Sequence, residues 1–205
     1  GWECAVDKFL EDGVLDELEQ KRLVGFSKHF GFSQEDLNIN GAWTKIVKAA
    51  ILQDIMNGAV PDRVNIQGSI PINLQKGETV VYAFADTEYL QDKTRRQTIG
   101  ASQGVSIRIM NGVYYRVGAF KGRPVEYNER VNVDAGWFVV TNKHIYFAGK
   151  LKSFRIPYIK IVSFEPFSDA IGVMRDAASA KAQFFITGDG WFTYNMITNL
   201  SRNAQ

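Results

Sequence analysis

The stretch that decides the fold is Gly136-Trp-Phe-Val-Val-Thr-Asn-Lys-His-Ile-Tyr-Phe147. Two short runs of β-branched and aromatic residues, 137–140 and 145–147, flank the polar triplet Thr141-Asn142-Lys143. Runs of this kind separated by turn residues are typical of antiparallel strands joined by a short connection. The stretch therefore predicts a β-hairpin with its turn at residues 141–143.

Similar runs occur on both sides of this hairpin. They cover residues 79–85, 105–110, 113–117, 154–156, 159–164, 171–174 and 184–187. Met110-Asn111-Gly112-Val113 is a second hairpin signal, because Asn-Gly readily takes the positive φ angles of a type I′ turn. Asp189 precedes apolar residues at helical spacing up to Leu200, which predicts an amphipathic closing helix with Asp189 as its N-cap. Strands and helices do not alternate, so we expect about seven antiparallel strands rather than a Rossmann-type sheet.

In residues 1–68 the apolar residues recur with the period of a helix rather than that of a strand. Apolar residues recur at helical spacing between Leu15 and Phe26 and between Trp43 and Ile55, and glycines separate these runs. Ser33 with Asp36 predicts a capped short helix, so we expect three or four helices between residues 2 and 58. The sequence thus predicts an α+β protein with a small helical domain at 1–68 and a β domain with a C-terminal helix at 69–205.

Charge changes at the same boundary. Residues 1–68 carry 7 Lys+Arg against 11 Asp+Glu, a balance of −4, whereas residues 69–205 carry 17 against 11, a balance of +6. This asymmetry predicts that the two parts pack together or self-associate through opposite charges. The overall balance of +2 is too small to make nucleic acid an expected partner.

Composition narrows the class of protein further. The chain has 205 residues, of which 45% are hydrophobic and 22% charged, values that argue against disorder. The single cysteine, Cys4, excludes an internal disulfide and a cysteine-rich zinc site, and favours a reducing compartment. No apolar run reaches the roughly 20 residues of a membrane-spanning helix. We expect a bacterial-type cytoplasmic protein without a cofactor, and the initial Gly in place of Met favours a fragment of a longer chain.

Gly136 to Phe147 followed by Phe154 to Phe164 resembles the core of a GRAM or bacterial PH-like domain. That family shows a Gly, an apolar strand ending in Thr-Asn, a basic residue, an aromatic strand and then a strand containing Ile-Pro. The resemblance covers residues 76–203. It implies a seven-stranded bent β-barrel capped by a C-terminal helix, which binds lipid head groups, peptides or neighbouring domains without catalysis.

The N-terminal part carries a second resemblance. Asp12-Gly13-Val14-Leu15-Asp16-Glu17-Leu18-Glu19 is similar to the phrase that opens a helix in TerB-like helical domains, and the likeness covers residues 2–60. The same phrase resembles half of an EF-hand loop, but the first and third ligand positions would be Lys8 and Leu10, which offer no side-chain oxygen. We interpret it as an interhelix turn with acidic residues at a helix N-terminus, and expect no metal.

A catalytic alternative rests on Gly100-Ala-Ser-Gln-Gly104, which matches G-x-S-x-G with Ser102 at its centre. Asp134 and His144 follow in the order of a hydrolase triad. A nucleophile elbow needs a buried strand before the serine and a helix after it, and neither is predicted here. A serine hydrolase stays a remote alternative, and we expect no enzyme.

The candidate binding residues are five cations. Lys93, Arg95 and Arg96 fall in the predicted loop between the first two strands, and Lys121 and Arg123 in a later turn. The PH-like resemblance implies that the loop after the first strand binds phosphate groups, and clustered cations attract an anionic membrane. Against this, basic residues in surface loops are usually only solvated.

The expected function is non-catalytic binding or scaffolding. We expect a protein partner or self-association, with a peripheral anionic membrane surface as the alternative. Neither a nucleic acid nor a small-molecule substrate is inferred. The aromatics of the β part are expected in the core and on the outer face, and a contiguous exposed group would indicate a docking surface.

Overall fold

The computed structural model describes residues 1–11, 15–38, 40–64, 70–99, 106–110, 113–116, 123–178 and 180–203. The side chains at positions 34, 96–99, 106–110, 113–116 and 123–128 lie outside this description. The chain forms two compact units, one of Gly1–Leu90 with Asn132–Gln205 and one of Gln91–Val131. The predicted division into 1–68 and 69–205 stays a prediction.

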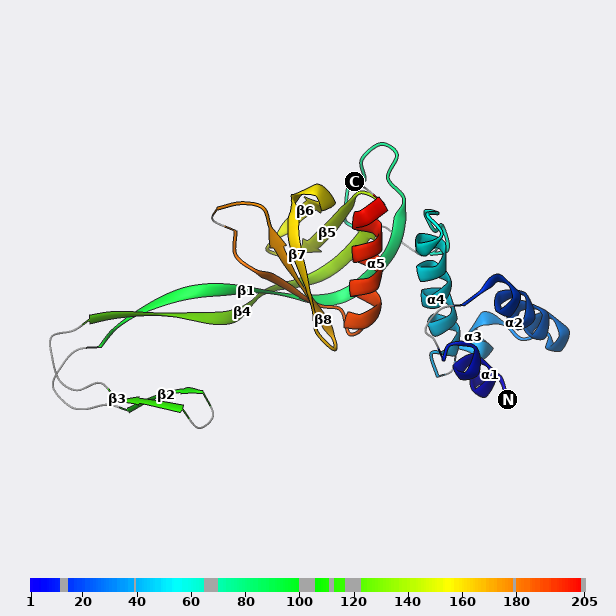
Figure 1. The fold of residues 1–205 in the computed structure, drawn as a ribbon, viewed down its shortest axis with the longest axis horizontal. Coiled ribbons are helices and arrows are strands. Elements are labelled where there is room, and N and C mark those ends of the chain that lie inside the picture. The colour runs from blue at the N-terminus through cyan, green and yellow to red at the C-terminus, as the bar shows by residue number, and fades with distance from the viewer. Residues whose placement is uncertain are drawn as a thin grey trace. The chain divides into compact units, whose positions relative to one another are not determined.

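In the described part of the chain, four helices precede the sheet (Figure 1). They are α1 (Trp2–Phe9), α2 (Glu17–Phe30), α3 (Gln34–Leu37) and α4 (Ala42–Met56). Asp16 caps α2 and Ser33 caps α3, each in a capping box. The side chain of the cap accepts from the N–H of the third helical residue, Glu19 or Asp36, and the side chain of that residue accepts from the N–H of the cap. The capped short helix at Ser33 is therefore confirmed. The acidic Asp16 and Glu19 serve a helix N-terminus, while residues 12–14 of the EF-hand-like phrase lie outside the described residues.

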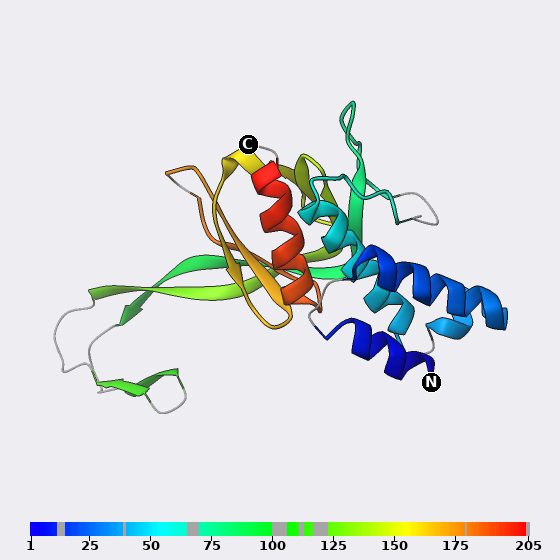
Figure 2. The same ribbon diagram turned by 45° about the vertical axis from the view of Figure 1, so that its right-hand side comes forward.

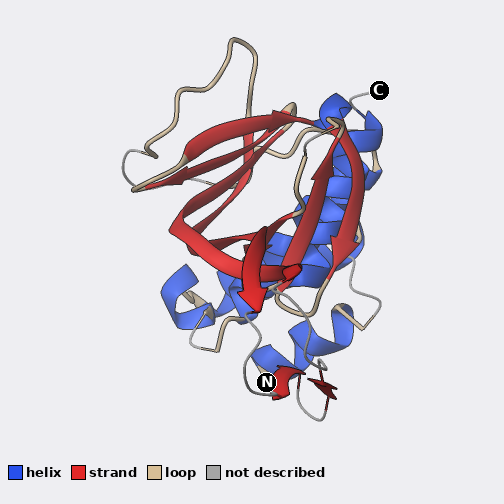
Figure 3. Cartoon of the chain, turned by 90° about the vertical axis from the view of Figure 1, so that its left-hand side faces the viewer, coloured by secondary structure: helices blue, strands red, loops and turns tan. Residues whose placement is uncertain are grey.

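The main sheet has seven antiparallel strands in the order β6-β5-β4-β1-β9-β8-β7. Their bounds are β1 (Val80–Ile99), β4 (Arg123–Thr141), β5 (His144–Gly149), β6 (Ser153–Pro157), β7 (Ile161–Pro166), β8 (Ala170–Arg175) and β9 (Gln183–Ile186), with a 3₁₀ turn η1 (Tyr158–Lys160) between β6 and β7. The strands curve around a common interior, with helices along one side (Figure 3). The sheet is not closed, because β6 and β7 form its two edges. The α+β class with N-terminal helices, seven antiparallel strands and a C-terminal helix is confirmed.

The hairpin at residues 136–147 is confirmed in register. Val140 pairs with Ile145 and Phe138 with Phe147, and all four side chains are buried in the core of the sheet. Gly136 and Gly149 are also opposite one another. A Cβ at Gly136 would lie 2.2 Å from the carbonyl oxygen of Ala148, so only glycine fits there.

The prediction of a loop at residues 93–96 is wrong. β1 continues as a strand to Ile99, and the next strand of the main sheet is β4, which begins only at Arg123. Ion pairs Asp92–Arg130 and Arg95–Glu129 join the two strands where they carry mostly polar residues. This segment was misjudged because an exposed ribbon shows no apolar alternation.

The second hairpin signal forms a separate sheet. β2 (Ser106–Met110) pairs antiparallel with β3 (Val113–Arg116), as the Asn-Gly signal predicted. Residues 111–112 at its turn lie outside the described residues. We expected these runs among the strands of the barrel, but they make a two-stranded sheet within the unit Gln91–Val131.

Helix α4 contributes to two hydrophobic cores. Its Ile51, Leu52 and Ile55 pack in the core of the sheet, together with apolar residues of α5 (Gly190–Asn203). Its Ala42, Ile46 and Ala49 pack instead against residues of α1 and α2. Figure 2 shows α4, in cyan, alongside α5, in red. The helices at the N-terminus and the sheet are therefore joined by one shared helix.

The closing helix begins as predicted. Asp189 accepts a hydrogen bond from the Phe192 N–H at 3.0 Å and so caps α5. Phe192, Met196 and Leu200 are buried in the core of the sheet. Among the described residues, every helix is too short or too polar to cross a bilayer.

Candidate binding surfaces

The five cations proposed from sequence all belong to the unit Gln91–Val131. Lys93, Arg95 and Arg96 lie in β1, and Arg123 is the first residue of β4, whereas Lys121 lies outside the described residues. Arg95 pairs with Glu129 on the facing strand, while Lys93 is exposed. The structure thus places four of the five on two paired strands rather than in loops.

This unit holds most of the net positive charge of residues 69–205. Residues 91–131 carry 8 Lys+Arg against 3 Asp+Glu, a balance of +5. The remaining residues carry 16 against 19, a balance of −3. The positive side of the charge asymmetry between residues 1–68 and 69–205 is therefore concentrated in a 41-residue segment.

The residues of the hydrolase alternative are not brought together where the structure describes them. Asp134 accepts backbone N–H bonds from Leu151 and Lys152, each at 2.7 Å, at one end of the β4–β5 hairpin. His144 lies beside the turn at the other end, roughly 20 Å away at the rise of a strand. Burial alone would raise the pKa of Asp134, but its backbone donors outweigh it and hold the pKa below the ordinary value. Ser102 lies outside the described residues.

A buried carboxylate, Glu78, organises the segment that leads into β1. Its side chain is fully buried and accepts hydrogen bonds from the Gln75 N–H and the hydroxyls of Tyr146 and Thr141. It also bonds His144 Nδ1. Burial opposes the charge of Glu78, but the hydrogen bonds with Tyr146, Gln75 and His144 bring its pKa below the ordinary value.

The surroundings of Glu78 also change the pKa of Tyr146, which hydrogen-bonds to it. Burial, followed by the hydrogen bond to Glu78, raises the pKa of Tyr146 to about 12. The Arg155 guanidinium also hydrogen-bonds Tyr146 and acts in the opposite direction. With the Gln75 amide oxygen turned toward it, Arg155 donates to that oxygen at 2.9 and 3.1 Å. Glu78, Tyr146, Arg155 and Gln75 therefore form one hydrogen-bonded network.

Aromatic rings gather on the N-terminal helices. Phe26 lies 5.7 Å from Trp2, 4.7 Å from Phe30 and 6.4 Å from Phe32, measured between ring centroids, and Phe30 lies 5.9 Å from Phe32. We call Trp2, Phe26, Phe30 and Phe32 the aromatic cluster. Phe30 is 57% exposed and Phe32 45%, so the cluster opens to solvent. Large exposed apolar patches on soluble proteins usually mark interaction sites.

The aromatics of the β part behave as expected where they are described. Tyr146 is buried, and Trp137, Phe154 and Phe164 are half-buried; the side chains of Tyr114 and Tyr115 lie outside the description. Phe154 packs against Phe147 in the core of the sheet. Among the described side chains, the contiguous exposed aromatic group lies on α2 and the segment that follows it, not on the strands.

No family model, no curated protein and no solved structure matches this chain. Function therefore has to follow from the geometry of its surfaces.

The described residues of the larger unit line at least four depressions, and two of these are notable for their aromatic or basic side chains. A groove of about 710 Å³ between α2, α4 and β1 is lined by Val24, Trp43, Val47 and Tyr82, among others. A smaller hollow of about 250 Å³ is lined by the cations Arg155, Lys160 and Arg175. The groove combines apolar side chains with the polar Gln20, Thr44 and Arg63, whereas the hollow is mainly basic.

Sequence reasoning missed the aromatic cluster and the Glu78 network. The i, i+4 spacing of Phe26 and Phe30 was the available signal, since residues four apart share a helix face. Trp2 joins them only through folding: its indole N–H donates to the Leu37 carbonyl at 3.0 Å. Glu78 gave no local signal, because its partners Thr141, His144 and Tyr146 are distant in sequence.

Proposed function

We propose that this chain is a non-catalytic binding module that docks a protein partner through the aromatic cluster. In this proposal residues 76–203 form a PH-like domain and residues 2–60 a TerB-like helical domain. The PH-like assignment is supported by seven antiparallel strands followed by a packed helix, which is the order of elements that the resemblance implies.

The exposure of the aromatic cluster carries the proposal. Phe26, Phe30 and Phe32 contact one another and Trp2 contacts Phe26, while Phe30 and Phe32 remain about half exposed. Aromatic residues are enriched at the centres of protein interfaces, where they bury large areas with little loss of side-chain entropy. A partner that covers these rings would remove this apolar surface from water.

Charge around the cluster indicates the chemistry of the partner. Residues 1–38 carry 4 Lys+Arg against 9 Asp+Glu, a balance of −5. Glu35 and Asp36 on α3 follow Phe32 closely in the chain and are exposed. The occupant we propose is therefore a segment of another protein with apolar side chains flanked by basic residues.

The proposal is tested by placing a photo-crosslinking amino acid at position 30 of the full chain in cells that express it. The same amino acid at Leu151, which is 76% exposed and lies in the turn after β5, is the control. We expect a discrete adduct from position 30 that position 151 does not give. The protein identified by mass spectrometry is then purified, and Phe30→Ser with Phe32→Ser should weaken its binding at least 10-fold.

Three outcomes contradict the proposal: equal adducts at both positions, an adduct whose purified protein binds the double variant as tightly as the wild type, or an adduct between two copies of this chain. The last outcome would make the cluster a self-association surface. Sedimentation velocity of the wild type and of the double variant distinguishes it from the heterologous complex.

A second candidate function is supported by a separate observation, the +5 balance of residues 91–131. We propose as the alternative that this unit attaches to anionic membranes, since each cation near such a surface contributes about 1 kcal/mol. Lys93→Glu with Arg96→Glu should abolish co-flotation with vesicles containing phosphatidylserine at low salt. Lys28→Glu, a charge reversal on α2, is the control and should float like the wild type. Flotation of the Lys93/Arg96 variant equal to that of the wild type would rule out this alternative.

A further inference from the structure

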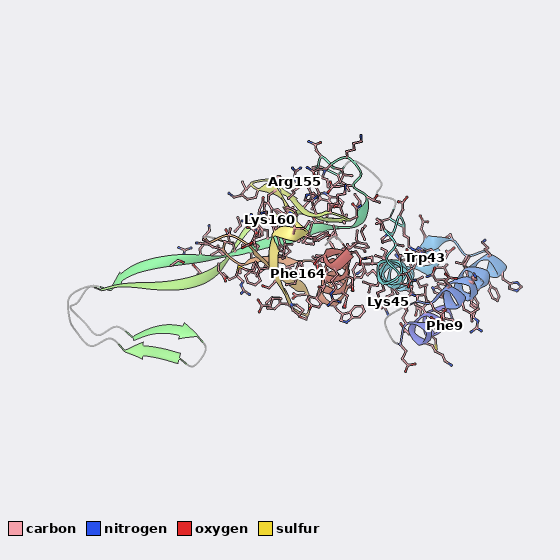
Figure 4. The ribbon with its side chains drawn as sticks, turned by 45° about the horizontal axis from the view of Figure 1, so that its top comes forward. Phe9, Trp43, Lys45, Arg155, Lys160 and Phe164 are labelled. Carbon is pink, nitrogen blue, oxygen red and sulfur yellow. The ribbon has the colours of Figure 1, made fainter. Side chains whose placement is uncertain are left out.

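The open side of the sheet contains a basic hollow that the proposed function does not use. Its volume is about 250 Å³. It is lined by residues of β6, η1, the end of β8 and the segment that follows, and these include Arg155, Pro157, Lys160, Arg175, Asp176 and Ala180. Figure 4 labels Arg155 and Lys160, which lie close to one another in that view.

Strand register brings two of the cations together. Arg175, the last residue of β8, pairs with Ile161, the first residue of β7. The Asp176 N–H then donates to the Lys160 carbonyl at 2.8 Å, which continues the ladder by one step. Lys160, the last residue of η1 before β7, is therefore held next to Arg175 at the end of β8, while Arg155 comes from the edge strand β6.

The cations of the hollow are not neutralised by the described part of the protein. Asp176 is the only carboxylate among the described residues that line it, and within that part of the chain no carboxylate lies within ion-pair distance of Lys160 or Arg175. Like charges held close together repel one another, and a bound anion relieves that repulsion. The hollow thus has an excess of positive charge without an internal counter-ion.

The side chain of Arg155 is positioned by hydrogen bonds to other residues of the protein. The Gln75 amide oxygen and the Tyr146 hydroxyl both bond its guanidinium, and Tyr146 is in turn fixed by the buried Glu78. A guanidinium has five N–H donors, so these contacts leave donors for a ligand. Positioning of this kind reduces the entropy lost when a ligand binds.

We propose that this hollow binds a phosphate monoester group or inorganic phosphate. Arginine presents paired donors that match the oxygens of phosphate, and Lys160 adds a point charge. The volume lies below the range typical of pockets for drug-sized ligands, which favours a small anion or a single head group over a large ligand. The site is distinct from the aromatic cluster and from the basic unit 91–131.

The test is a titration of the ¹⁵N-labelled full chain with sodium phosphate at constant ionic strength, followed by amide chemical shifts. We expect saturable shifts at Lys160, Arg175, Asp176 and Ala180. Lys160→Gln and Arg175→Gln should each weaken binding at least 5-fold, and the double variant should show no saturation. Both side chains are exposed, so the variants should keep the circular dichroism spectrum of the wild type.

Lys181→Gln is the matched control, because Lys181 is an exposed cation in the segment between β8 and β9 that does not line the hollow. It should bind phosphate like the wild type. Equal binding by the wild type and the Lys160/Arg175 double variant would overturn the proposal. So would saturable shifts that lie elsewhere, or an identical response to chloride.

Two sources of the phosphate group are separated by a second arm. Neutral vesicles with and without phosphatidic acid are mixed with the wild type, with the Lys160/Arg175 double variant and with Lys93→Glu/Arg96→Glu. Binding that depends on phosphatidic acid and on Lys160 and Arg175, but not on Lys93 and Arg96, identifies a lipid head group. Saturable binding of free phosphate without such vesicle binding identifies a soluble ligand.

Discussion

The ammonium group of Lys48 on α4 lies 2.7 Å from one carboxylate oxygen of Asp189, and the other oxygen caps the first turn of α5. Both side chains are largely buried, and the same ammonium lies over the rings of Tyr82 and Phe192. One aspartate therefore fixes the start of the closing helix and also anchors the helix that carries the N-terminal segment.

This arrangement predicts a graded loss of stability. Asp189→Ala should lower the free energy of unfolding by about 2 kcal/mol, because it removes a helix cap and leaves Lys48 without its partner. Asp189→Asn keeps a capping oxygen and should have about half that effect. Urea unfolding followed by far-UV circular dichroism measures both. Asp62→Ala, at an exposed aspartate, is the control, and equal midpoints for Asp189→Ala and Asp62→Ala would contradict the prediction.

The shared helix predicts a single cooperative transition. Ile51 on α4 is fully buried in the core of the sheet, so Ile51→Ala should destabilise the protein by about 2–5 kcal/mol. Ala42, Ile46 and Ala49 on the same helix belong to the core of the N-terminal helices, so both parts should unfold together. Tryptophan fluorescence and circular dichroism should therefore give coincident curves.

Met56→Ala is the matched control on the same helix. Met56 is 60% exposed, and its truncation should change the free energy of unfolding by less than about 0.5 kcal/mol. Two separate transitions, with only one of them shifted by Ile51→Ala, would show that the helices and the sheet fold independently.

The buried Glu78 predicts a loss of stability in acid. Its pKa in the folded protein lies below the ordinary value, so its carboxylate stabilises the fold above that ordinary value and loses this effect as pH falls through the lowered pKa. Glu78→Gln should lower the free energy of unfolding by about 1–3 kcal/mol at pH 7, since three donors lose a charged acceptor.

The difference between the wild type and Glu78→Gln should shrink as pH decreases from 6 to 3, and denaturant midpoints over that range measure it. Glu165→Gln, at an exposed position of β7, is the control and should follow the wild type at each pH. If the stability difference between the wild type and Glu78→Gln does not change with pH, Glu78 stabilises the fold through its packing rather than through its charge.

Two glycines predict opposite effects of the same substitution. Gly136→Ala should destabilise the protein strongly, because its Cβ would lie 2.2 Å from the Ala148 carbonyl oxygen in the facing strand. Gly25→Ala should stabilise it by about 0.5–1 kcal/mol, because α2 is open there and alanine is the better helix former. Thermal unfolding compares both variants directly. Stabilisation by Gly136→Ala would show that β4 and β5 can separate at that point.

Local patterns were enough for much of the fold. The hairpin at residues 136–147 was predictable because two apolar runs, 137–140 and 145–147, lie on either side of the polar triplet 141–143. The caps at Ser33 and Asp189 were predictable because each lies next to the helix that it serves.

Features that depend on distant residues were not predictable. β1 continues past Asp92 because Arg130 and Glu129 pair with it from a strand that lies more than 30 residues later. The pairing of β7 with β8 brings Lys160 beside Arg175 in the basic hollow, and Arg155 joins them from β6, so no single segment encodes the site. The aromatic cluster likewise needs Trp2 beside Phe26.

The sharing of α4 between two cores has a consequence during synthesis. Lys48 and Asp189 are 141 positions apart, so the ribosome must produce most of the β part before the sheet-facing side of α4 can be covered. Until then the segment that forms α4 has been synthesised, but its apolar residues Ile51, Leu52 and Ile55 have no sheet to cover them. Such exposure on a nascent chain invites aggregation, and contacts of this sequence separation form slowly. A chaperone that binds short apolar helices would therefore meet this protein first at α4, before the closing helix has emerged.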